Sequence, residues 1–178
     1  NARTLKHLEN ALLIYVETIP HDSQSYPIYV TAYRPRSGDF FQKYVAPPPN
    51  TAKHIMEKLM TITPEYCSKR ISKNDCHELF NEFKAEGDVP TAWNQKSLDA
   101  LSHIGPRHLL KATYCNLTKG PSGHLNDILG SLGLTAQATP FPGRANERMG
   151  ATIALHQHLL KLARVQKDFQ PPTETKIA

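Results

Sequence analysis

Three short runs of β-forming residues occupy the start of the chain, and they constrain the fold more than any other feature. The runs are ALLIYVET (11–18), PIYVTAYR (27–34) and DFFQKYVA (39–46), each rich in aromatic and branched residues. Polar turn residues at 21–23 and 36–38 separate them. Because short connections of this kind join neighbouring antiparallel strands, the sequence predicts a three-stranded antiparallel meander.

Helical segments follow the meander. The prolines at 47–49 end the third run, since proline cannot donate to a sheet ladder. Apolar residues at helical spacing predict a helix over 51–60 and a second one that starts after a cap at Ser72 and closes at Gly87. The longest helical pattern covers 144–165 and is apolar mainly on one side.

A further strand is predicted between these helices. DVPTAWN (88–94) is a short β-like run, in which we expect Trp93 to lie in the core and Asn94 to cap the next helix. A meander followed by alternating helices and a strand indicates an α/β protein, with a mixed central sheet and flanking helices.

The length and composition fit one compact domain. The 178 residues are 39% hydrophobic and 21% charged, which is enough apolar surface for a core. We expect a single domain over 1–165 and a flexible tail or linker over 166–178. No segment has the apolar length that crosses a bilayer, and the start lacks a signal-peptide pattern. We therefore expect an intracellular protein, nuclear or cytoplasmic, of which this chain is one part.

Charge, cysteines and histidines add weaker expectations. A net charge of +5 permits contact with nucleic acid or with acidic protein surfaces. Cys67, Cys76 and Cys115 lack the spacing of a zinc site or disulfide framework, so free thiols are expected. His156 and His158 lie two apart on the long helix and point to different faces, so we expect surface or boundary positions instead of a metal pair.

The order of these segments resembles the DnaQ-like (DEDD) 3′–5′ exonuclease domain, which has the RNase H-like fold. The resemblance covers about residues 11–163 and lies in several motifs that follow one another in the family's order. The first strand of that family carries D-x-E-T, and the matching residues here are Tyr15-Val16-Glu17-Thr18. Glu17 is retained, whereas Tyr15 stands in place of the aspartate.

The second and third motifs lack their functional residues. The pattern h-N-a-x-F-D is similar to WNQKSL (93–98), which places Leu98 where the family has a catalytic aspartate. The pattern H-x-A-x-x-D is similar to GRANER (143–148), where Gly143 replaces the general-base histidine and Arg148 replaces a metal-binding aspartate. The resemblance thus implies the scaffold of the family without most of its catalytic groups.

In this family two divalent ions, Mg²⁺ or Mn²⁺, cleave the phosphodiester, and carboxylate oxygens hold them. One carboxylate cannot hold both ions against their hydration, and Arg148 adds positive charge where a metal would sit. The resemblance therefore predicts a pseudo-exonuclease that has lost its two-metal site and binds no cofactor. We interpret Glu17 as a remnant of that site, now paired with Arg148.

Our first expectation for function is an inactive exonuclease-like module that binds a protein partner or a second copy of itself within a larger protein. Degenerate domains of this type in the maelstrom family and the promyelocytic leukaemia protein imply nuclear or RNA-silencing settings.

Two alternatives remain open. One is a domain that binds RNA or DNA without cutting it. Its candidate contact residues are Arg34, Arg36, Lys43, Trp93, Asn94 and Arg144. The other is an active exonuclease with displaced ligands, in which Glu17, Asp99 and Asp127 form a rearranged site or Glu147 compensates for Arg148.

Overall fold

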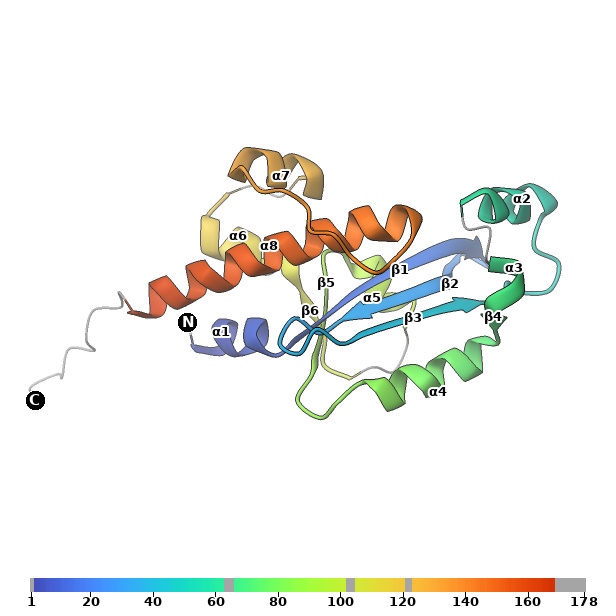
Figure 1. Cartoon of the computed structure of the whole chain (residues 1–178), viewed down its shortest axis with the longest axis horizontal. Coiled ribbons are helices and arrows are strands. Elements are labelled where there is room, and N and C mark those ends of the chain that lie inside the picture. Colours follow the sequence, from blue (N-terminus) through green and yellow to red (C-terminus); the bar gives the residue numbers. More distant parts are fainter. Residues whose placement is uncertain (1, 63–65, 102–104, 121–122, 169–178) are drawn as a thin grey trace, which may run out of the picture.

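A mixed six-stranded sheet, in the order β4-β3-β2-β1-β5-β6, forms the centre of the molecule (Figure 1). The computed structural model describes residues 2–62, 66–101, 105–120 and 123–168. The strands are β1 (Ala11–His21), β2 (Gln24–Tyr33), β3 (Phe40–Val45), β4 (Arg70–Ile71), β5 (Val89–Ala92) and β6 (His108–Leu109). β1, β2 and β3 pair antiparallel, whereas β4, β5 and β6 each join in parallel. The predicted meander and mixed sheet are confirmed.

Helices cover both faces of this sheet. They are α1 (Ala2–Glu9), α2 (Lys53–Ile62), α3 (Tyr66–Lys69), α4 (Lys73–Phe83), α5 (Gln95–Asp99), α6 (Leu110–Thr118), α7 (Leu125–Leu132) and α8 (Gly143–Asp168). The long predicted helix is α8, which continues to Asp168, past the expected domain end. The sequence patterns missed α1 and the two-residue strands β4 and β6, because two residues are too few to show an alternation. No helix within the described ranges combines the length and the apolar character needed to span a membrane.

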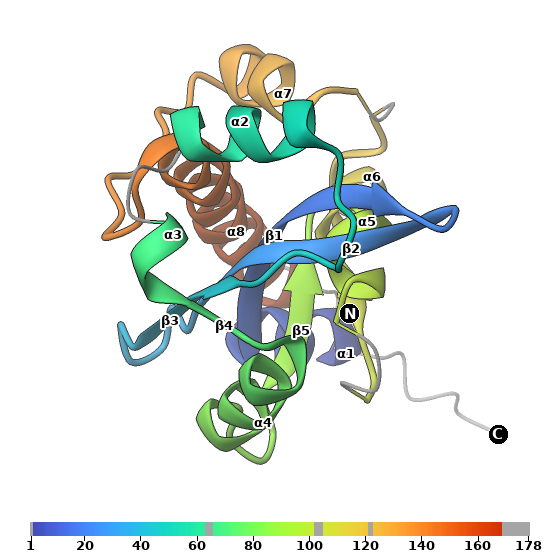
Figure 2. The same cartoon turned by 90° about the vertical axis from the view of Figure 1, so that its right-hand side faces the viewer.

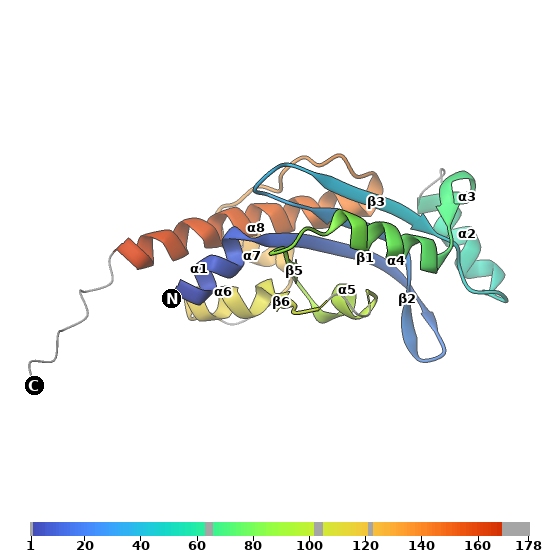
Figure 3. The ribbon, with the colours of Figure 1, turned by 90° about the horizontal axis from the view of Figure 1, so that it is seen from below.

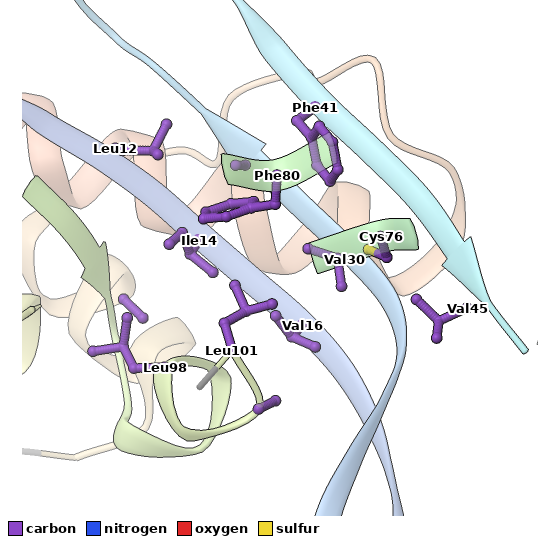
Figure 4. Close-up of a cluster of buried hydrophobic side chains, with 13 residues drawn as sticks. Leu12, Ile14, Val16, Val30, Phe41, Val45, Cys76, Phe80, Leu98 and Leu101 are labelled. Atoms are coloured by element: carbon purple, nitrogen blue, oxygen red, sulfur yellow. The ribbon is translucent and has the colours of Figure 1, made fainter. Parts of the chain in front are cut away.

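One face of the sheet packs on α4 and α5. The even-numbered β1 side chains Leu12, Ile14 and Val16 contact Phe80 of α4 and Leu98 of α5 in one buried cluster (Figure 4). Successive strand side chains point to opposite faces, so the odd-numbered β1 residues face the other way. Even-numbered residues of this part of β1 therefore face α4 and α5, and odd-numbered residues face the opposite side of the sheet.

The opposite face packs on α8, and Figure 2 shows α4 and α8 on opposite sides of the strands. Leu13 of β1 and Tyr29 of β2 form a buried cluster with Ala145, Met149 and Ile153 of α8. Helices α1, α6 and α7 pack around the same long helix in a third cluster (Figure 3). Because α8 contacts both the sheet and these helices, most of its circumference is buried.

Two local predictions were wrong, and packing explains both. His156 is only 1% exposed, because it faces α1 and its Nε2 atom lies 2.7 Å from the Leu8 carbonyl oxygen. The second helix, α4, does begin after Ser72, whose hydroxyl accepts a hydrogen bond from the Asp75 amide. It ends before Lys84, however, where the Phe83 carbonyl accepts a hydrogen bond from Arg34 just after β2, and Gly87 lies instead in the turn that leads to β5.

Candidate functional site

Residues of the first and third motifs meet where β1 faces the start of α8. Tyr15 and Glu17 are odd-numbered residues of β1, so their side chains point toward α8. Arg144 and Arg148 lie four residues apart in α8, so they share one face of the helix. All four residues line one cleft of about 500 Å³.

Helices α2 and α5 complete this cleft. Their lining residues include His54, Ile55 and Lys58 from α2 and Lys96 and Ser97 from α5. Among the described residues that line the cleft, Glu17 is the one carboxylate, and the four lysine and arginine side chains are Lys58, Lys96, Arg144 and Arg148. The sequence analysis missed Lys58 and Lys96, because nothing local in α2 or α5 marks a lysine that will face β1.

The Glu17 carboxyl is 9% exposed and lies within hydrogen-bonding reach of the Tyr15 hydroxyl. Burial raises the pKa of Glu17, while Arg144, the Tyr15 hydroxyl and Arg148 act to lower it. Burial, with a contribution from Glu17, also raises the pKa of Tyr15 to about 12. Among the described residues no close ion pair joins Glu17 to Arg148, so the predicted pairing is not a direct contact, although Arg144 and Arg148 both act electrostatically on the carboxyl.

Hydrogen bonds from α5 and β2 hold this part of β1 in place. The Ser97 hydroxyl accepts a bond of 3.2 Å from the Val16 amide, and the Thr31 hydroxyl donates one of 2.6 Å to the Tyr15 carbonyl. The Asn94 side chain accepts from the Ser97 amide at 3.4 Å, which confirms the predicted cap. The cleft wall therefore rests on buried or part-buried contacts between three elements.

The start of α8 is held by the segment that precedes it. The Gln137 amide donates to the Gly150 carbonyl at 3.0 Å, and a Cβ atom at position 150 would lie 2.2 Å from the Gln137 carbonyl oxygen. The Asn146 side chain accepts bonds from the amide and hydroxyl of Thr139 at 3.1 and 2.8 Å. Glycine at 150 thus permits the close approach that orients the first turns of α8, which carry the cleft arginines.

Three of the six candidate nucleic-acid contacts lie at this cleft. Arg144 and Asn94 line it directly. Trp93 borders a small adjoining cavity of about 40 Å³, which shares Tyr15 and Arg148 with the cleft. Its ring is half-buried and packs against the edge of the α1, α6, α7 and α8 cluster, so Trp93 lies at the boundary of the core and not inside it.

The other three candidates lie outside the cleft. Arg34 is buried, and its Nη2 atom lies 2.7 Å from a carboxylate oxygen of Asp88. Arg36 is exposed and donates to the Asn10 side chain at 2.7 Å. Lys43 lies on β3 beside the segment that contains Pro140. The six candidates therefore do not form one surface.

Apart from Glu17, the carboxylates considered for a rearranged site do not line the cleft. Asp99 ends α5 and accepts hydrogen bonds from Gln95 and Arg107, while Asp127 and Glu147 are exposed on α7 and α8. Leu98 is 1% exposed and belongs to the core on the other face. Within the part of the chain that the structure describes, no group of three or more His, Cys, Asp and Glu residues is placed to hold a metal ion.

Comparison with solved structures identifies exonuclease X in complex with 5′-overhanging duplex DNA as a structural neighbour. The TM-score is 0.65 at 14% sequence identity, and the alignment covers 88% of this chain and 93% of that chain. No protein-family profile matches the chain, and no curated protein sequence matches it. At this identity the likeness shows the fold, and it confirms the predicted RNase H-like exonuclease fold.

Proposed function

We propose that this domain binds a nucleic-acid strand in the cleft without cutting it. The observation that carries the proposal is the charge of the cleft, where one carboxylate and four cationic side chains stand among the described lining residues. Backbone phosphates supply most of the affinity of nucleic acid for proteins, and lysine and arginine are the groups that neutralise them. The structural neighbour is bound to DNA, which supports an exonuclease fold as a scaffold for a strand.

The cleft residues do not fit a pair of divalent metal ions. Magnesium prefers several carboxylate oxygens, and within the described lining of the cleft only Glu17 supplies them. Arg144 and Arg148 would repel a cation in the same space. Tyr15 stands where the family has an aspartate, and with a pKa of about 12 it stays protonated and neutral at physiological pH. These residue types are the reason why we propose that the domain does not cut the strand.

The cleft offers cations from three directions. Lys58 belongs to α2, Lys96 to α5, and Arg144 and Arg148 to α8. All four side chains are on exposed positions, so solvent and a ligand can reach them. A flexible single strand can place successive phosphates against separate cations, which favours single-stranded over double-stranded ligands in this cleft.

The test is a titration of labelled single- and double-stranded RNA and DNA at two salt concentrations, with a manganese-dependent cleavage assay on the same samples. We expect binding that weakens steeply with salt, without cleavage. A double variant K58Q/K96Q should bind more weakly, whereas K161Q/K167Q, with the same charge change near the end of α8, should bind like the parent chain. Absence of binding, or degradation of the strand, would contradict the proposal.

A second candidate, the protein-interaction module expected first from the sequence, has one observation in its favour. β4 pairs only with Tyr44 and Val45 of β3, so in the described chain no strand covers the outer edge from Phe40 to Lys43. Phe40 is 46% exposed and contacts Phe141 edge to face. An uncovered edge of this kind can accept a strand from a second copy. Sedimentation of the parent chain and a Phe40→Glu variant tests it, with self-association expected only in the parent.

A further inference from the structure

Two of the four cations of the cleft lie on one turn of α8. Arg144 and Arg148 project from the same helix face beside Tyr15 and Glu17. In the described part of the chain, neither guanidinium forms a hydrogen bond or a close ion pair with another residue, although both act electrostatically on Glu17. Both guanidinium groups line the cleft and can contact an anionic ligand there.

The groove around these arginines narrows at one end and widens at the other. At Arg148 it adjoins the cavity of about 40 Å³ lined by Leu125 and Thr152, which has room for a few water molecules but not for a nucleotide. At Lys96 it adjoins a hollow of about 530 Å³ beside the β1–β2 hairpin, lined by residues 23–25 and Asp99. A strand that lies along the groove from the hairpin therefore ends near the arginines.

We propose that this narrow end recognises the terminal phosphomonoester of a strand, with Arg144 and Arg148 binding the phosphate. The inference rests on the proposed function and names the chemical group that the cleft selects. A terminal phosphomonoester carries a charge of about −1.5 to −2, more than the single charge of an internal diester. Arginine presents a planar set of donors that matches phosphate oxygens in pairs.

Two neighbouring groups fit this assignment. The Tyr15 hydroxyl lies at the same place, within hydrogen-bonding reach of Glu17, and it can turn to donate to a phosphate oxygen instead. Arg148 stands at the motif position that the resemblance assigns to a metal-binding aspartate, so a side chain supplies positive charge there. In our assignment a phosphate end binds at this position, and no bond is made or broken.

The test compares one oligonucleotide in three forms: hydroxyl groups at both ends, a 3′-phosphate, and a 5′-phosphate. Affinity is measured by fluorescence anisotropy, and inorganic phosphate is used as a competitor. We expect one phosphorylated end to bind about tenfold more tightly than the hydroxyl form, the effect of one charged hydrogen bond. The end that gains affinity identifies the strand polarity in the groove.

Variants locate the effect. R148Q and R144Q should remove the preference for the phosphorylated end, and R148K should keep part of it because lysine retains the charge but not the paired donors. R164Q is the matched control, since Arg164 lies on the same helix, about 24 Å further along, and its Nε atom faces Glu9 at 3.7 Å. R164Q should preserve the preference. Circular dichroism melting checks that each variant is folded.

The outcomes separate this inference from the proposed function. Salt-sensitive binding that is equal for all three ends, or a preference that survives in R148Q and R144Q, would overturn the terminal-phosphate assignment and leave strand binding intact. Absence of binding to every oligonucleotide would overturn both. A preference lost in the cleft variants and kept in R164Q supports the assignment.

Discussion

Two regions of this molecule combine arginine with a carboxylate, and they use the pair in opposite ways. Near the β2 end, Arg34 contacts Asp88 through Nε and Nη2 at 2.7–3.2 Å and also donates to the Phe83 carbonyl. The side chains of Arg34 and Asp88 are 9% and 0% exposed. In the cleft, Arg144 and Arg148 are exposed and act on the carboxyl of Glu17 without such close contacts.

The difference shows how charge is divided between stability and binding. A buried ion must be paired and hydrogen-bonded, because an isolated charge is costly in the interior. Arg34 meets this condition through partners in its own chain. Its charge therefore supports the folded state and is not available to a ligand. The cleft arginines are solvated and have no such partners among the described residues, so a phosphate can become their partner.

The largest effect on stability is expected at the buried pair of Arg34 and Asp88. Asp88→Ala should lower the free energy of unfolding by about 3–5 kcal/mol, because it leaves Arg34 buried without its main partner. Urea denaturation measures the loss. The matched control is Asp39→Ala, whose side chain is 64% exposed at 3.3 Å from Arg34. This variant should lose less than about 1 kcal/mol of unfolding free energy. Similar losses for both variants would show that the buried pair contributes no more to stability than the exposed one.

In the cleft we expect the opposite: a substitution should change ligand affinity and leave stability nearly unchanged. Arg148→Gln should change the free energy of unfolding by less than about 0.5 kcal/mol, as is usual for an exposed side chain. It should lower the affinity for a phosphate-ended strand by about tenfold, the loss of one charged hydrogen bond. Denaturation and anisotropy on one preparation test both parts. A large loss of stability would assign Arg148 the structural role of Arg34.

Glu17→Gln tests the remaining carboxylate. Removal of its negative charge should strengthen strand binding a few-fold, about 0.5–1 kcal/mol, because the carboxylate repels phosphate in the same cleft. Glu147→Gln is the matched control, since Glu147 is exposed on α8 and does not line the cleft. Equal effects of the two variants would show a response to net charge instead of to the site.

The smallest predicted effect concerns a buried base. His156 donates through Nε2 to the Leu8 carbonyl in its neutral form, and its Nδ1 atom is buried without a hydrogen-bond partner. Burial, with a contribution from Arg164 on the same helix, lowers the pKa of His156 despite the bond to Leu8. The unfolded chain therefore binds the proton more readily than the folded chain.

Stability should consequently be full above the unfolded pKa of about 6.5 and decline as the pH falls below it. The measurement is the denaturation midpoint between about pH 5 and pH 8. His108 also has a lowered pKa, through burial and the nearby His7, so the contribution of His156 is the difference from a His156→Gln variant. An unchanged pH profile in that variant would contradict the prediction.

Much of the fold could be predicted from local sequence alone. Alternating residues in β1, turn residues between the strands, and the Ser72 and Asn94 caps act over a few positions, so their signals are readable in the chain. The end of α4 and the burial of His156 could not be read in this way. They depend on which element packs against them, and the residues next to them in the sequence do not indicate that element.

In the candidate site, too, some features could be predicted from the sequence and others could not. The resemblance to the exonuclease family pointed to Glu17, Arg144 and Arg148, because its motifs keep their order and spacing along the chain. It could not distinguish Arg34 from Arg148, since both are arginines in polar surroundings along the chain. Folding placed Arg34 beside Asp88 and brought Lys58 and Lys96 from separate helices to face β1. Charge acts through space, so the availability of an arginine is set by the neighbours that the fold supplies.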